Sequence, residues 1–240
     1  MAAPKPASFP DQFVIAGRWC RLEPLAPAHA ESLYRAGGGT DRSRYKYLSE
    51  YAPGGVPELE TWIARVRKRP DRLYTAVMDA KTNRCVGRQA LIRLRPEHAA
   101  LELGSIMWGD GAARTRVGTE AFFLAARHVF EELGYRRLEW KCDARNEASR
   151  GAALRFGFIY EGLFRQDMIV KGEPRDTAWY SMLADEWTAL KPAYEAWLSP
   201  KNFDRKGQQK TRLGTPRPEE AAPEEPAAAP TDPDKSGTGP

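Results

Sequence analysis

The sequence predicts an α/β (α+β) domain built on a mixed, mostly antiparallel sheet. Strand-like segments at 72–79, 85–95 and 100–108 follow one another with short connections, which favours antiparallel neighbours. After residue 108, strand-like and helix-like segments alternate, so at least one connection must cross over to a parallel strand. These elements fall within residues 12–200, which we expect to form a single domain.

Turn and periodicity signals define the elements before these strands. Residues 13–25 read as two short strands with a turn between them, and Pro27 opens a short helix that ends near the glycines at 37–39. The segment 57–68 predicts an amphipathic helix. Its apolar face is made by Leu59, Trp62, Ile63 and Val66.

Helices and strands alternate in the second half of the domain. Residues 119–133 carry an apolar helical stripe that stops at Gly134, and 137–142 alternates apolar and polar side chains as a strand does. Asn146 is a good N-cap for a short helix that ends at Gly157.

A hairpin and a helix complete the predicted domain. Segments 163–170 and 176–183 flank a turn and predict the hairpin. The last helix contains Pro192, which should kink or restart it. Its apolar face is made by Trp187, Leu190, Tyr194 and Trp197. Core packing or a dimer contact explains this face better than a substrate site, so the pattern leaves a homodimer open.

Composition argues against several classes of protein. The chain has no run of 18 apolar residues and no apolar signal core, so we expect no membrane segment and a cytoplasmic location. Three cysteines lie far apart, and neither CxxC nor HExxH occurs, so we expect no disulfide framework and no metal site. The net charge of +5 suits an anionic ligand but is too modest to indicate nucleic acid.

Both ends of the chain have the composition of segments without a packed core. Residues 1–11 read as a flexible lead-in, and 201–240 as a disordered tail rich in Pro, Ala and Glu. The tail has a basic part, 201–217, followed by an acidic part, 218–240. A docking role for the basic part, on a protein partner or on nucleic acid, is the alternative to a solvated appendage.

The stretch GDGAARTRVGTE, residues 109–120, predicts an anion site between a strand and a helix. It lacks the Gly-Lys-Ser/Thr of a P-loop, and Arg114 replaces the third glycine of a dinucleotide fingerprint. The features that remain suit a diphosphate: backbone amides at the start of a helix, the charges of Arg114 and Arg116, and the close ligand approach that Gly118 allows.

Four stretches occur in an informative order and spacing. They are RLEPLAPAHA at 21–30, RVGTEAFFLAARHVFEELG at 116–134, RRLEWKCDARNEASRGAALRFGFIYEG at 136–162 and RDTAWYSMLADEW at 175–187. Through them the chain, over about 12–198, resembles the GNAT superfamily of acyl-CoA-dependent N-acyltransferases, and most closely its RimJ/RimL-type, ribosomal-protein-alanine acetyltransferase-like branch. The resemblance implies the GNAT acyl-CoA N-acyltransferase fold, in which helices flank a central sheet that is split at the cofactor site.

The same resemblance implies acetyl-CoA as co-substrate, lying between the strands 100–108 and 137–142. The residues implied as its contacts are Ile106, Met107, Trp108, Arg114, Thr115, Arg116, Val117, Gly118, Thr119, Asn146 and Ser149. The loop departs from the family pattern at Arg116, where glycine is usual, so this arginine either contacts phosphate or crowds the loop. Gly151, inside the second helix, indicates close approach of a neighbour or of the cofactor.

The implied reaction is direct attack of an amine on the thioester. A protonated amine must first lose a proton, for which a carboxylate is the natural base, and the departing thiolate needs a proton donor. The resemblance implies Ser149 as that donor. Glu102 is a candidate base, and Asp167 is a second one, one residue before the position that carries a carboxylate in this branch. Tyr160 and Tyr180 are hydroxyl alternatives.

The sequence therefore predicts an acetyl-CoA-dependent N-acetyltransferase that acts on a primary amine, either a protein N-terminus or a small molecule. The rival interpretation is a non-catalytic acyl-CoA-binding regulatory domain, which the imperfect loop and the missing strand carboxylate favour. Cys142 lies on the apolar face of its strand with Leu138 and Trp140, so we expect no acyl-enzyme there. The acceptor groove is expected between 37–57 and the 171–176 turn.

Overall fold

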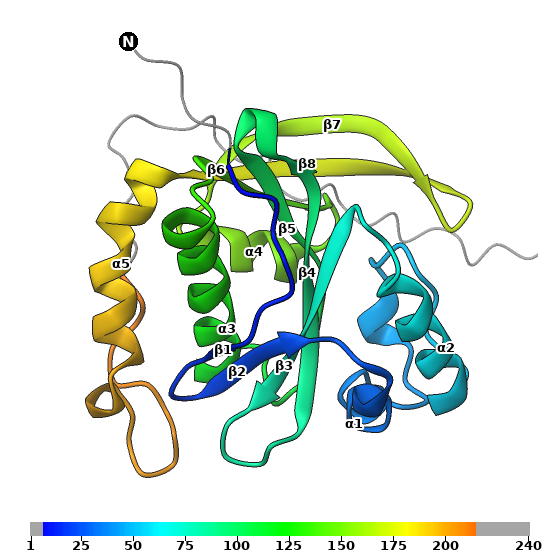
Figure 1. Ribbon diagram of the computed structural model, residues 1–240, viewed down its shortest axis with the longest axis horizontal. Coiled ribbons are helices and arrows are strands. Elements are labelled where there is room, and N and C mark those ends of the chain that lie inside the picture. Colours follow the sequence, from blue (N-terminus) through cyan, green and yellow to red (C-terminus); the bar gives the residue numbers. More distant parts are fainter. Residues whose placement is uncertain (1–6, 215–240) are drawn as a thin grey trace, which may run out of the picture.

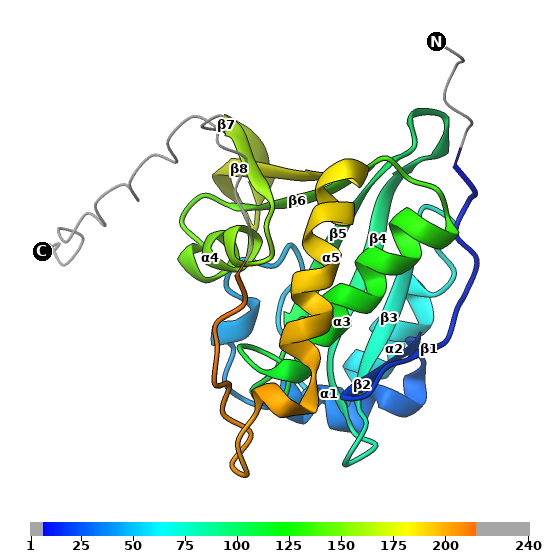
Figure 2. The ribbon, with the colours of Figure 1, turned by 90° about the vertical axis from the view of Figure 1, so that its left-hand side faces the viewer.

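The computed structural model describes residues 7–214, which form one sheet with helices on both faces (Figures 1 and 2). In this part of the chain the strand order is β1-β2-β3-β4-β5-β6-β8-β7. The strands are β1 (Ile15–Ala16), β2 (Cys20–Pro24), β3 (Arg72–Asp79), β4 (Cys85–Arg95), β5 (Ala100–Trp108), β6 (Arg137–Asp143), β7 (Ile159–Val170) and β8 (Glu173–Leu183). Neighbours are antiparallel except for β5 and β6, which confirms the predicted mixed sheet.

Helices cover the sheet on two sides. Helices α3, α4 and α5 lie on one face, and α1 and α2 lie on the other (Figure 2). The helices are α1 (Ala30–Ala36), α2 (Val56–Val66), α3 (Arg116–Arg127), α4 (Glu147–Arg155) and α5 (Ala184–Leu198). Within residues 7–214, no helix has the length and hydropathy needed to cross a lipid bilayer.

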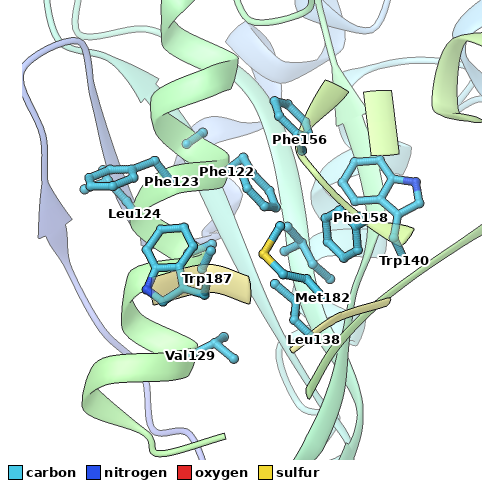
Figure 3. Packing of buried hydrophobic residues seen from close by; sticks show 14 of the residues in the cluster. Phe122, Phe123, Leu124, Val129, Leu138, Trp140, Phe156, Phe158, Met182 and Trp187 are labelled. Carbon is cyan, nitrogen blue, oxygen red and sulfur yellow. The ribbon is translucent and has the colours of Figure 1, made fainter. Parts of the chain in front are cut away.

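Each face of the sheet has its own hydrophobic core. On the side of α3 and α5, aromatic rings fill the space, and those of Phe122 and Phe156 stack with centroids 4.4 Å apart (Figure 3). Trp187 and Tyr194 of α5 are buried in this core, so the aromatic stripe of the last helix is a packing feature. Helix α5 continues through Pro192 and does not restart there, because its buried face holds both halves against the core.

Strands β5 and β6 separate soon after they meet. Their pairing is confined to three positions, Ala100 with Arg137, Leu101 with Leu138 and Glu102 with Glu139. Beyond these, β5 stays paired with β4 as far as Trp108, and β6 stays paired with β8 as far as Asp143. The sheet is therefore split between the two strands, as the family resemblance implied.

A β-bulge shapes β5 at this opening. Met107 pairs with Arg88 and Gly104 pairs with Ala90, so β5 has one extra residue between these two pairs. Ser105 adopts a left-handed backbone with φ 48°. The extra residue reverses the alternation of the strand, which turns Ile106 toward the face of α3.

Residues 201–214 differ from the expected disordered tail. Pro200–Asn202 form a 3-10 turn, and Phe203 then bridges to Gln209. The side-chain amide of Asn202 donates to the carbonyl of Trp197, and Phe203 packs edge-on against that tryptophan. Two anchored side chains thus hold a segment whose composition alone gives no sign of order. Residues 215–240, the rest of the predicted tail, lie outside the described residues.

The end of the predicted lead-in is also attached to the domain. The amide of Ala7 donates to the carbonyl of Pro96, and the amide of Ser8 donates to that of Leu133. These backbone hydrogen bonds depend on no side-chain pattern, which is why composition did not indicate them. Residues 1–6 lie outside the described residues.

Candidate active site

A pocket of about 930 Å³ lies between the end of β5, the start of α3, helix α4 and the segment 203–209; we call it the α3–α4 pocket. Eight of the eleven residues implied as cofactor contacts line it: Ile106, Trp108, Arg114, Thr115, Arg116, Val117, Asn146 and Ser149. The structure thus brings helix α4 beside a strand end and a loop that lie well before it in the sequence.

Three of the implied contacts do not line this pocket. The side chain of Met107 is buried in the core on the opposite face, because the bulge at Ser105 reverses the alternation of β5. Gly118 and Thr119 are buried within the first turn of α3. A Cβ added to Gly118 would lie 2.3 Å from the carbonyl oxygen of Ala112. The glycine is therefore needed for packing of the loop against the helix. The close ligand approach expected there stays a prediction.

Thr115 caps the N-terminus of α3. Its hydroxyl accepts from the amide of Val117 at 3.1 Å and donates to the carbonyl of Ala112 at 2.9 Å. The residue before it, Arg114, has a left-handed backbone with φ 59°, which is uncommon for a residue other than glycine. The loop therefore presents the positive end of the α3 dipole to the pocket from a strained turn.

Arg116 is held by aromatic rings. Its guanidinium lies 3.9 Å from the ring centroid of Trp19 and 5.3 Å from that of Phe203. Cation–π contacts of this kind fix the side chain at the edge of the pocket without neutralising its charge. The position of the side chain, against Trp19 and Phe203, favours contact with phosphate over crowding of the loop, and both alternatives stay predictions.

Arg155 adds a second positive charge to the pocket. Its guanidinium donates to the hydroxyl of Thr119 at 3.1 Å and lies 5.1 Å from the ring of Trp197. Burial lowers its pKa, and within residues 7–214 no carboxylate forms an ion pair with it. A partly buried cation without a counter-ion favours a bound anion. Lys206 lines the same pocket.

Ser149 is oriented by two hydrogen bonds. Its hydroxyl accepts from the indole Nε1 of Trp140 at 3.0 Å, and its amide donates to the side-chain oxygen of Asn146, the N-cap of α4. Because the indole can only donate, the hydroxyl proton of Ser149 points elsewhere. The neighbouring thiol of Cys142 is buried, which raises its pKa to about 11 and keeps it a neutral thiol.

A second pocket, of about 610 Å³, lies on the opposite face beside the hairpin of β7 and β8; we call it the hairpin pocket. Ser105 and Lys141 line it, whereas their neighbours Ile106 and Trp140 line the α3–α4 pocket. The two pockets therefore approach each other through the opening between β5 and β6.

The hairpin reaches the loop that precedes α2. In Figure 1 the hairpin extends over the side of the sheet that carries α1 and α2. The ammonium group of Lys171 at its tip donates to the carbonyl of Tyr45 at 2.6 Å. Tyr47 of that loop lines the hairpin pocket. The two segments expected to form an acceptor groove thus lie together.

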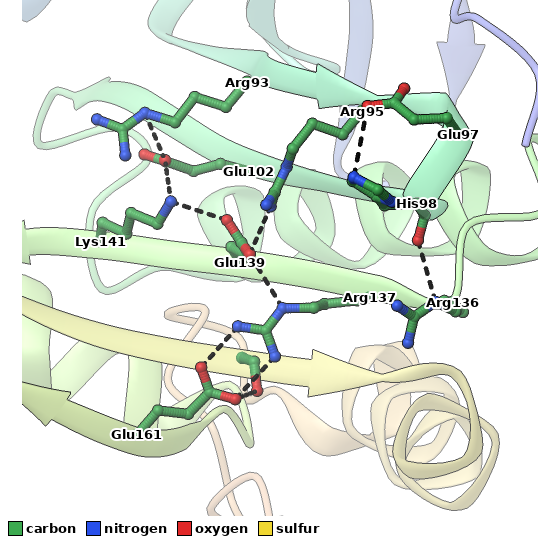
Figure 4. A network of polar contacts seen from close by, with 11 residues as sticks. Arg93, Arg95, Glu97, His98, Glu102, Arg136, Arg137, Glu139, Lys141 and Glu161 are labelled. Carbon is green, nitrogen blue, oxygen red and sulfur yellow. Dashed lines mark hydrogen bonds and ion pairs between the residues drawn. The ribbon is translucent and has the colours of Figure 1, made fainter.

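Glu102 lies in the hairpin pocket beside the opening. The residue is 5% exposed, and its Oε2 lies 3.4 Å from both Arg93 Nε and Lys141 Nζ (Figure 4). Burial raises its pKa, although the charges of Arg93 and Lys141 oppose that shift. A carboxyl group whose pKa is raised in this way is suited to accepting a proton near neutral pH.

The other candidates occupy different surroundings. Asp167 is exposed on β7, next to the register shift between Phe164 and Met168, and it is Met168 that lines the hairpin pocket. Tyr160 and Tyr180 are buried, with ring centroids 5.4 Å apart. Among residues 7–214, no group of three or more His, Cys, Asp or Glu side chains could hold a metal ion.

Sequence reasoning missed several charged residues of the two pockets, among them Arg93, Lys141, Arg155 and Arg175. Lys141 could have been found from its alternation with Trp140 and Cys142, since it faces the side away from α3. Gly104, a glycine inside a strand, was a signal of the bulge. The position of Arg175 opposite Met168 depends on the register shift in β7, and nothing in the sequence signals that shift.

Known proteins resemble this chain in sequence and in structure. Residues 20–159 match the family model described as an acetyltransferase (GNAT) domain. The structure of a GCN5-related N-acetyltransferase from Brucella melitensis has a TM-score of 0.84 and 47% identity, covering 87% of this chain and 96% of that one. A GNAT-family acetyltransferase structure from Chromobacterium violaceum ATCC 12472 has a TM-score of 0.73 and 36% identity, covering 78% and 94%.

A curated relative carries a more specific name. A protein named as ribosomal N-acetyltransferase YdaF of Bacillus subtilis (strain 168) is 38% identical over 64 residues, which are 27% of this chain and 35% of that protein. The family match, the fold and this relative agree with the split sheet and with the pocket at the start of α3. The chain belongs to the GNAT family and is an N-acetyltransferase.

Proposed function

We propose that the protein transfers an acetyl group from acetyl-CoA to a primary amine by direct attack, without an acyl-enzyme. The acceptor is a protein N-terminus or the amine of a small molecule. The relative named for ribosomal N-acetylation supports the first class. The observation that carries the proposal is the approach of two pockets at the β5–β6 opening, with Ser149 on one side and Glu102 on the other.

The α3–α4 pocket fits acetyl-CoA. Its volume of about 930 Å³ is that of a pocket for a large cofactor. The start of α3, with Arg116 and Arg155 beside it, suits phosphate groups. A Cβ added to Gly151, which lines the pocket, would meet no atom within 4 Å, so the glycine leaves that wall open. When bound, acetyl-CoA would supply the thioester whose acyl group is transferred.

Residues of the chain would perform the proton transfers. Glu102 would accept the proton that the amine must lose before it attacks, directly or through a water molecule. Ser149 would donate its hydroxyl proton to the departing sulfur, in an orientation fixed by Trp140. Ser105 and Ile106 have no Cα partner on β4, and an amide at this bulge would meet the oxygen that gains charge.

The test is release of CoA. The protein is incubated with acetyl-CoA and a panel of peptides and small amines, while a thiol reporter follows CoA and mass spectrometry detects the acetylated product. Turnover with any amine supports the proposal. Binding of acetyl-CoA without CoA release across the panel would instead favour the non-catalytic regulatory domain.

A cytoplasmic location belongs to the same proposal. The three cysteines, Cys20, Cys85 and Cys142, are free thiols, a state that a reducing compartment maintains. A homodimer stays a prediction, which sedimentation of the purified protein would check.

A further inference from the structure

The hairpin pocket is lined by more positive than negative side chains. Its charged residues are the cations Arg72, Arg93, Lys141 and Arg175 and the carboxylates Asp71 and Glu102. Such a lining raises the local concentration of anionic groups and opposes cationic ones. The question is which of these cations is free to bind a ligand.

Three of the four cations already have carboxylate partners. Arg72 pairs with Asp71 at 2.7 Å. Arg93 and Lys141 share Glu102, and Lys141 also lies 2.8 Å from Glu139 (Figure 4). These pairs use both carboxylates that line the pocket.

Arg175 is different. This arginine is on β8, where it pairs with Met168 of β7, and it is partly buried. Its Nε is shielded from solvent and has no hydrogen-bond acceptor among residues 7–214. The charge of Arg175 helps to lower the pKa of Asp143. That carboxylate, however, already accepts hydrogen bonds from Arg145 at 2.9 and 3.0 Å. A guanidinium donor that is buried without an acceptor is unfavourable, so the site favours an acceptor supplied by a ligand.

Arg175 and Glu102 face the same pocket from different strands. Lys141 lies 3.5 Å from the ring of Trp179, its partner on β8, which puts both on the hairpin-pocket face. Arg175 is four residues before Trp179, so the alternation of β8 keeps it on that face. An acceptor that fills the pocket would thus have its amine near Glu102 and the rest of the molecule against Arg175.

Resting on the proposed function, we propose that the preferred acceptor is a primary amine that carries a carboxylate close by, as in a peptide whose second residue is acidic, and that Arg175 binds this carboxylate. Arg175 is then a residue that determines acceptor specificity, whereas Glu102 and Ser149 act on the amine and the sulfur. The excess of positive side chains that line the hairpin pocket also disfavours polycationic amines.

Three peptide amides that differ only in their second residue test this: Ser-Asp-Ala-Ala, Ser-Asn-Ala-Ala and Ser-Lys-Ala-Ala. Calorimetry measures their Kd for the protein saturated with CoA, and the thiol assay measures kcat/KM with acetyl-CoA. A charge-assisted hydrogen bond predicts that the Asp peptide binds about tenfold more tightly than the Asn peptide, with the Lys peptide weakest.

The variant R175Q should bind the Asp and Asn peptides equally. The control R165Q removes an exposed arginine of the same hairpin that does not line the pocket, and it should keep the preference. Circular dichroism and the Kd for CoA check that both variants fold.

The outcomes separate this inference from the proposed function. Equal Kd values for the three peptides, preference for the Lys peptide, no binding of the Asp peptide at millimolar concentration, or an equal loss for all three in R175Q would overturn the inference. A retained ranking of Kd values without any acetyl transfer would overturn the proposed catalysis and leave the assignment of Arg175 standing.

Discussion

Trp140 and Lys141 are consecutive on β6, yet they line two pockets on opposite faces of the sheet. The indole of Trp140 donates to Ser149 at 3.0 Å, while the ammonium group of Lys141 lies 3.4 Å from Glu102. One short piece of strand therefore orients the proposed acid on one face and the proposed base on the other. Variants of these groups should affect catalysis while cofactor binding is retained.

Replacing Glu102 with Gln should lower kcat about 10²–10⁴-fold, the usual contribution of a general base, while the Kd for CoA changes little. Burial raises the pKa of Glu102, and the proposed role needs the charged carboxylate. The kcat of the wild type should therefore rise with pH through that raised pKa and then level off.

The matched control for this variant is Asp167→Asn, which changes the exposed rival carboxylate on β7. Its kcat should equal that of the wild type. If this control lost turnover while Glu102→Gln kept full activity, the general base would be Asp167 and not Glu102.

Ser149→Ala should lower kcat at least about tenfold and leave the KM for the amine unchanged, because the hydroxyl acts on the leaving sulfur. Stopped-flow measurement of CoA release checks this. Cys142→Ala is the control beside it, since a neutral buried thiol takes no part in direct transfer. Inactivity of a folded Cys142→Ala protein would argue for an acyl-enzyme instead.

Arg155→Gln should raise the Kd for CoA about tenfold, with a smaller dependence on salt than in the wild type, because one charge-assisted contact is lost. Isothermal titration at two ionic strengths measures both effects. Arg127 on α3 offers a comparison, since it also stacks on a ring, at 5.7 Å from Phe123, but does not line the pocket. Equal weakening in both variants would point to a general charge effect.

Glu139 should contribute stability that depends on pH. Burial would raise its pKa, but hydrogen bonds from Lys141, Arg137 and Arg95 outweigh this and lower the pKa to about 2. A pKa lowered by folding stabilises the folded state above the unfolded pKa of 4.5, and this contribution is lost as the pH falls toward 2.

The test compares Glu139→Gln with the wild type in urea unfolding at several pH values. The variant should be less stable at pH 7 by on the order of 2 kcal/mol, and the two curves should converge in acid. Glu97→Gln, at an exposed position, should follow the wild type throughout. A gap for Glu139→Gln that stays constant down to pH 3 would contradict the assigned ion pairs.

Periodicity was sufficient for the elements whose apolar faces are buried. The stripe of Phe122, Ala126 and Val129 predicted α3, and short connections predicted the antiparallel strands β3, β4 and β5. The split between β5 and β6 came only from the family resemblance, because a separation of two strands depends on what fills the gap and leaves no periodic signal.

The site was predicted less completely because one extra residue in β5 changes the face of the sheet on which the following side chains lie. The bulge at Ser105 turns the side chain of Met107 into the core on the opposite face of the sheet. Of the three cofactor contacts expected on β5, Ile106 and Trp108 therefore line the α3–α4 pocket and Met107 does not. Packing within the loop decided the role of Gly118, whose added Cβ would meet the carbonyl oxygen of Ala112. Neither fact follows from local propensity.

The wall that Phe203 to Gln209 contribute comes after every strand of the sheet. As the chain leaves the ribosome, the sheet and its helices can assemble before this wall exists, since domains fold as their residues emerge. The pocket proposed for acetyl-CoA should thus be completed only after the sheet has formed. Truncation after Ser199 should therefore weaken the binding of acetyl-CoA, because the pocket loses the wall from Phe203 to Gln209.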